Sequence, residues 1–173
     1  MFYFETFRSI LVVTQMTGRQ AMAQDSRHMG NVVLLRGASL WLLVALVLAW
    51  CLVFMKADAA FIKVVFKDFD RLLQAHIDFL LMTALIFGFY AARVQLPWHV
   101  RWSMVVGAFT NSSIFLVQAI SPMPGPTEPA AGEIAVILFQ LFSLISVVIT
   151  TYGFGMASIL VFRSTFDKTE STY

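Results

Sequence analysis

The sequence predicts an all-α membrane protein: a four-transmembrane-helix bundle preceded by an N-terminal amphipathic helix at the membrane interface. Of the 173 residues, 59% are hydrophobic and only 13% are charged, and the mean hydropathy is +0.78. Soluble domains carry about 25% charged residues, so little of this chain can form one. Four stretches reach the length of about 20 mostly apolar residues that a spanning helix needs. A net charge of +2 without a basic block gives no indication of nucleic-acid binding.

Residues 1–30 are predicted to form the interfacial helix. Phe4, Phe7 and Leu11 recur at helical spacing, and polar residues stand between them. A loose tail is the alternative for this segment. The N-terminus also lacks the basic start of a signal peptide.

Residues 31–165 are predicted to form the transmembrane domain, followed by a tail at 166–173. The four predicted spans are 38–55, 73–92, 103–120 and 134–162. The link at 56–72 mixes charges with aromatic side chains and is predicted to be a short amphipathic segment at the outer interface. The link at 121–133 holds four of the five prolines and suits either a stiff cap over the bundle or an ordinary connector.

The distribution of Lys and Arg predicts the orientation of the bundle. The N-terminal arm, the second link and the tail together hold eight of them, and the other side holds four. Cytoplasmic loops carry the excess of Lys and Arg. We therefore expect both termini in the cytoplasm, with the bundle in a bacterial inner membrane.

His76 is the only histidine within a predicted span, because His28 and His99 fall in polar flanks. An ionisable ring at membrane depth is costly, so it usually faces a bundle interior and indicates a functional site. We expect its ring to face the third and fourth spans. Asp78 lies two residues, or about 200°, further around the helix, so the two side chains cannot face one ligand. Asp78 then faces a neighbouring helix, a second subunit or interfacial water.

Asn111 and Gln140 are the catalytic candidates, because both place an amide in the outer half of a predicted span. Facing helices of a bundle build sites from such side chains, although packing between helices is the alternative role. Gly107 and Gly153 belong to stripes of small residues that permit close helix approach. Ser112 and Ser113 are expected to bond back to their own backbone carbonyls.

A single buried imidazole supports three functions: axial ligation of haem iron, proton transfer, or hydrogen bonding between helices. One protein ligand would leave the second axial position of the iron open. A tetrahedral zinc site lacks ligands here, since Cys51 is the only cysteine.

Three short motifs resemble a known family. They are Gln74-Ala75-His76 at the start of a helix, Asn111 in the next helix, and Ser121-Pro122 opening a Pro/Gly-rich link. This pattern is similar to that of the small four-helix membrane isomerases typified by styrene oxide isomerase, and of the related hydroxylaminobenzene mutases, over about residues 71–160.

The resemblance implies a multi-pass membrane protein that forms a trimer. It also implies haem b with His76 as its axial ligand, the iron acting as a Lewis acid on an epoxide oxygen, and Asn111 near the substrate pocket. The chain departs from the isomerase pattern at Met82, Gly107 and Phe115, where that family has Asn, Asp and Tyr. A different substrate, or loss of the reaction, is therefore expected.

Two functions stay open from the sequence, and a transporter is less favoured because the sequence has no repeated half. The first is a membrane-embedded isomerase of a small lipophilic ligand, possessing haem b or no cofactor. The second is a non-catalytic accessory subunit of a larger membrane complex. In both, the partners are the lipid bilayer and either further copies of this chain or other subunits.

Overall fold

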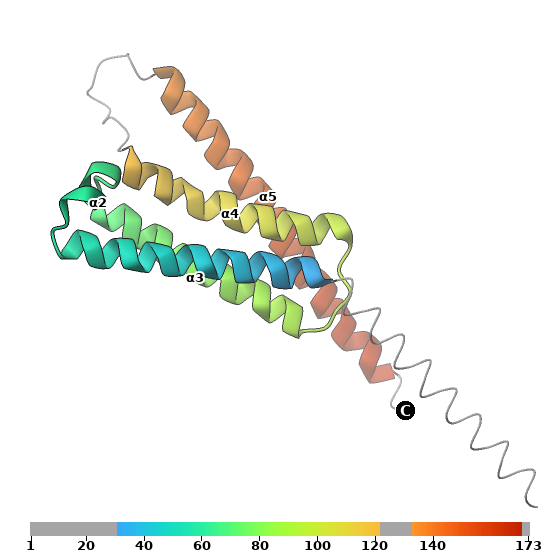
Figure 1. The fold of residues 1–173 in the computed structure, drawn as a ribbon. Helices are drawn as coiled ribbons and strands as arrows, with labels where there is room; N and C mark the ends of the chain where they lie inside the picture. The colour runs from blue at the N-terminus through green and yellow to red at the C-terminus, as the bar shows by residue number, and fades with distance from the viewer. Residues whose placement is uncertain (1–30, 122–132, 171–173) are drawn as a thin grey trace, which may run out of the picture.

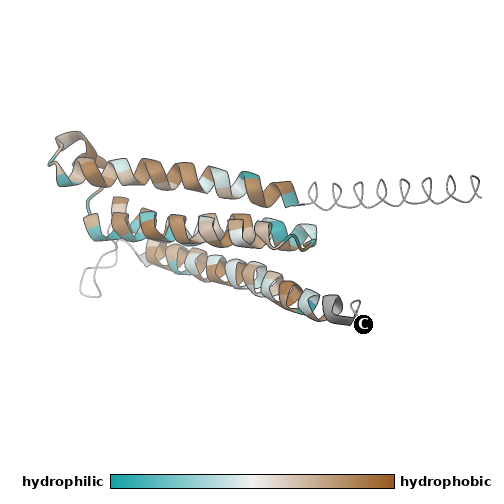
Figure 2. Cartoon of the chain, turned by 90° about the horizontal axis from the view of Figure 1, so that it is seen from below, coloured by the Kyte–Doolittle hydropathy of each residue, from teal (hydrophilic) through white to brown (hydrophobic). Residues whose placement is uncertain are grey.

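The computed structural model describes residues 31–121 and 133–170, and it shows helices and no strand within these ranges (Figure 1). Four helices are long and apolar enough to cross a membrane. They are the first span, Asn31–Lys56, then α3, Phe69–Ala91, α4, Trp98–Ile120, and α5, Glu133–Glu170. Hydrophobic residues cover most of these helices (Figure 2). The prediction of four helices of spanning length is confirmed.

The helices begin earlier than the hydropathy of the sequence indicates. The first span is already helical at Asn31, α3 starts at Phe69 and α4 starts at Trp98, each several residues before the predicted start. Polar residues at a helix end lower the hydropathy without breaking the helix. His99 therefore lies in the first turn of α4, and its place in a polar flank of the membrane span stays a prediction.

The link after the first span folds back onto the bundle as a short helix, α2, Ala60–Val65. Ile62 of α2 and Phe66 directly after it are buried, while Phe61 is exposed. The backbone nitrogen of Lys67 donates to the carbonyl of Ala119, 2.8 Å away, and so gives a hydrogen-bond donor to a carbonyl in the last turn of α4. This confirms a short segment with one buried face, and its position at the membrane interface stays a prediction.

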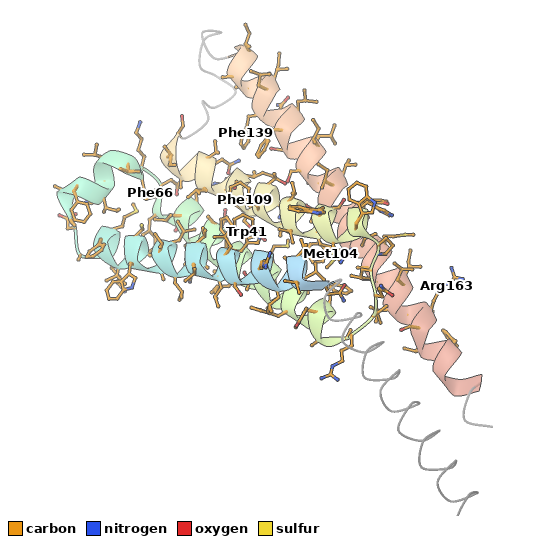
Figure 3. All side chains as sticks on the ribbon, turned by 45° about the vertical axis from the view of Figure 1, so that its right-hand side comes forward. Trp41, Phe66, Met104, Phe109, Phe139 and Arg163 are labelled. Atoms are coloured by element: carbon orange, nitrogen blue, oxygen red, sulfur yellow. The ribbon has the colours of Figure 1, made fainter. Side chains whose placement is uncertain are left out.

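α4 lies at the centre of the bundle. In its most apolar stretch of 18 residues, 39% of the residues are buried, which is the highest share among the four spans. Trp41 of the first span packs against α4, where its Nε1 donates to the carbonyl of Val105 at 3.1 Å. Its ring stacks on Phe109 with centroids 4.6 Å apart. Figure 3 shows these two rings together between the two helices. Trp41 also adjoins both hydrophobic clusters of the core, and so links them.

α5 crosses the other helices, and its first half diverges from α4 (Figure 1). Only 6% of the residues in its most apolar stretch of 18 residues are buried. Its helix continues to Glu170, into the segment predicted as a tail. The predicted interfacial helix at 1–30 and most of the proline-rich link lie outside the described residues.

Candidate functional site

The start of α3 fixes the depth of His76. Asp68 caps this helix, because its side chain accepts a hydrogen bond from the backbone nitrogen of Arg71 at 3.0 Å. His76 follows Phe69 by seven residues, which places it about 10 Å along the helix at 1.5 Å per residue. The ring thus lies about two turns into α3, one turn deeper than the predicted helix start indicates.

The imidazole of His76 is held by the first span. Its Nδ1 lies 2.9 Å from the carbonyl oxygen of Ala45. A carbonyl oxygen only accepts hydrogen bonds, so Nδ1 must carry the proton. In the neutral ring, Nε2 then bears the lone pair. Among the described residues no group hydrogen-bonds to Nε2, and the side chain is half-buried.

Ala45 is suited to this contact because its side chain is small. It is fully buried, as is Ala75 of α3, which directly precedes the histidine. Both alanines belong to one core cluster, and small side chains let helix backbones approach closely. A helical carbonyl keeps a second lone pair, so the oxygen of Ala45 can accept from the ring in addition to its own helix.

Asp78 is paired on the other side of α3. Its Oδ2 accepts from Asn111 Nδ2 at 3.0 Å and from Ser112 Oγ at 2.8 Å, both on α4. His76 and Asp78 thus face different neighbours, as their helical phase predicts. Of the three environments expected for Asp78, the structure shows the neighbouring helix.

Two expectations about these residues are wrong. The ring of His76 faces the first span, not the third and fourth spans, because the first span lies on that side of α3. Ser112 donates to Asp78 instead of its own helix, since the carboxylate lies within reach. Ser113 does bond back as expected, to the carbonyl of Phe109 at 2.7 Å.

α4 and α5 meet through close backbone approach. A Cβ added to Gly107 would lie 2.8 Å from Thr150 Cα, and one added to Gly153 would lie 2.7 Å from Met104 N. These glycines therefore permit the close approach that the small-residue stripes predict. Ser146 Oγ also donates to Thr110 Oγ1 across this contact, at 2.9 Å.

The three candidate residues lie in three separate environments. His76 contacts the first span, Asn111 contacts Asp78, and Gln140 is exposed on the diverging half of α5. Within the described part of the chain, no hydrogen bond joins any two of these side chains. A catalytic role for Asn111 and Gln140 stays a prediction.

The donor set fits one kind of metal cofactor. In the described ranges, no three His, Cys, Asp or Glu side chains lie close enough together to hold a bare metal ion. Haem brings four nitrogen ligands of its own and needs only one axial ligand from the protein. The Nδ1 of His76 is hydrogen-bonded to a carbonyl and its Nε2 has no hydrogen-bond partner among the described residues, and metal-binding histidines usually have this arrangement.

No protein-family model, curated protein or solved structure matches the chain. The resemblance to the membrane isomerases therefore rests on the sequence motifs alone.

Proposed function

We propose that this protein is a membrane-embedded isomerase of a small lipophilic molecule and that it holds haem b through Nε2 of His76. The observation that supports this most is the hydrogen bond from Nδ1 to Ala45, which assigns the free lone pair to Nε2. His76 also joins α3 to the first span, and its free Nε2 leaves a second role open to the same ring.

The surroundings of His76 have two effects on a ligand bound there. The carbonyl of Ala45 fixes the tautomer and the orientation of the ring, so that Nε2 would be the atom that binds the iron. The side chain is half-buried and lies in a helix of spanning length, where a lipophilic molecule can arrive through the bilayer. Haem iron with one open axial position would supply Lewis-acid polarisation of a substrate oxygen.

Absorption spectroscopy of the purified protein tests cofactor binding. We expect a Soret band in the wild type after expression with a haem precursor, and loss of that band in His76→Ala. His99→Ala is the matched control, because this histidine lies at the other end of the bundle with its Nδ1 2.9 Å from Tyr152 Oη. Absence of the band from the wild type, or equal loss in both variants, would contradict the proposal.

Catalysis needs a separate assay. The haem-loaded protein in detergent is mixed with a lipophilic aryl epoxide, and aldehyde formation is followed by gas chromatography. We expect product above that of the His76→Ala protein given the same free haem. If the protein binds haem but converts none of a panel of epoxides, haem binding is supported and epoxide isomerisation is contradicted.

The second candidate is an accessory subunit of a larger membrane complex, and the exposure of α5 favours it. Only 6% of the residues in the most apolar stretch of α5 are buried, so most of its apolar surface is free to contact lipid or another helix. Cysteine pairs that crosslink Leu141 or Val148 of α5 to one defined neighbouring subunit, in a protein without a Soret band, would support this role instead.

A further inference from the structure

An apolar groove runs between the first span and α4, near the end of the bundle that holds Asn31 and Trp98. It has a volume of about 450 Å³, within the usual range for small-molecule sites, about 300–1,000 Å³. Trp41, Trp102, Val106 and Phe109 contribute its apolar walls, and Arg36 is its one charged lining residue. The groove therefore combines an apolar length with a cationic end.

The inner wall of the groove is rigid. Trp41 is fixed by its hydrogen bond to the carbonyl of Val105 and by its stacking on Phe109, with 24° between the ring planes. Gly37 forms part of the floor, where an added Cβ would lie 2.6 Å from a methyl group of Val105. The two helices are thus in contact behind the groove, which is preformed and does not depend on an occupant to separate them.

The charged end of the groove suits an anion at the membrane interface. Arg36 is exposed, and so is half of Trp102 (51%). Arg101 directly precedes Trp102, and its buried Nε has no hydrogen-bond partner among the described residues. Arginine and tryptophan together at the end of a span mark the headgroup level. Basic pockets between transmembrane helices bind anionic lipid headgroups.

We infer that this groove binds one anionic phospholipid, with an acyl chain along Trp41 and Phe109 and the phosphate beside Arg36. Two features carry the assignment: a length of apolar wall that suits a hydrocarbon chain, and a guanidinium whose positive charge a lipid of zero net charge would leave uncompensated. The charged end of the groove is distinct from the proposed haem site, since Ala45 follows Arg36 by nine residues, about 14 Å along the first span.

Native mass spectrometry of the full chain in detergent tests this inference. The protein is titrated with phosphatidylglycerol or with phosphatidylcholine of the same acyl chains. We expect one phosphatidylglycerol to bind at least about fivefold more tightly, the factor for one arginine near an anionic headgroup. Arg36→Gln should remove that preference. Arg163→Gln is the control, because Arg163 is exposed near the C-terminal end of α5 and does not line the groove (Figure 3).

A second pair of variants tests the groove itself. Val106→Trp fills it, whereas Val148→Trp adds the same bulk to the exposed surface of α5; the two valines are 41% and 59% exposed. We expect only Val106→Trp to abolish the tight phospholipid. Equal affinity for both headgroups in the wild type, or equal effects within either pair of variants, would overturn the inference.

A photoreactive benzoylphenylalanine at position 106 keeps the test decisive if the filled variant does not fold. Crosslinking in a mixed bilayer should give an adduct with the mass of phosphatidylglycerol, and the same group at position 148 should show no headgroup preference. An adduct with residues 1–30 or with a second copy of the chain would refute a lipid as the occupant.

Discussion

Replacing Gly153 by alanine should force α4 and α5 apart. The added Cβ would lie 2.7 Å from Met104 N and 2.8 Å from the carbonyl carbon of Ser103. Both neighbours are backbone atoms of α4, so no side chain can rotate away to make room. Carbon contacts are optimal at about 3.5–4.0 Å, and the helices must therefore separate locally by about 1 Å.

Gly155 provides the matched control for this substitution. It lies on the same helix two residues later, and a Cβ there would meet nothing within 4 Å. Both changes gain the same helix propensity, about 1 kcal/mol in an exposed helix. Only Gly153→Ala adds the cost of overpacking, typically about 1–3 kcal/mol. The free energies of unfolding of the two variants should thus differ by about 1–3 kcal/mol, with Gly153→Ala the less stable.

Equilibrium unfolding in mixed detergent micelles measures this difference. The denaturing detergent is titrated, and helix content and tryptophan fluorescence are followed together. Gly107→Ala should behave like Gly153→Ala, because its Cβ would lie 2.8 Å from the backbone of Thr150 on the opposing helix. If Gly153→Ala is as stable as Gly155→Ala, the close approach of these helices is refuted.

Two further predictions concern polar contacts. Asn111→Leu removes a donor to Asp78 and should lower stability by about 1 kcal/mol in the same assay. Ser113→Ala, which loses only a bond within its own helix, should change it little; equal effects would count against a specific role for the amide. In the link before α3, the hydrogen bond and the charge of Lys63 lower the pKa of Asp58 below its ordinary value. Any stabilisation from this pair is present above the ordinary pKa of an aspartate and is lost as the pH falls through the lowered value. Lys63→Gln should therefore raise the pKa of Asp58 in a carboxyl NMR titration, and an unchanged titration would show that the pair does not form.

The spans could be predicted from the sequence because apolar length alone determines them. Their starts could not, since Asn31 and Asp70 are polar residues that are nonetheless helical. For α3 the missing signal was the cap: Asp68 accepts from the nitrogen of Arg71, and an aspartate before a helical stretch is a typical N-cap. The charged composition of the link obscured it.

The partners of the site residues were less predictable. Helical phase placed His76 and Asp78 on opposite faces of their helix, and the structure confirms this. Phase does not say which helix lies on each side. The contact of His76 is also a backbone carbonyl, and every residue of a helix has one, so nothing in the identity of Ala45 marks it as a partner.

α3 is held to its two neighbours by side chains only two residues apart. His76 joins it to the first span and Asp78 joins it to α4, so rotation of α3 about its axis would strain both contacts. α5 is held differently, through the backbone approach at Gly107 and Gly153. Variants that loosen α5 should therefore leave the hydrogen bond between His76 and Ala45 intact. A haem site at His76 would then survive the Gly153→Ala change, and the stability test and the cofactor test report on separate parts of the bundle.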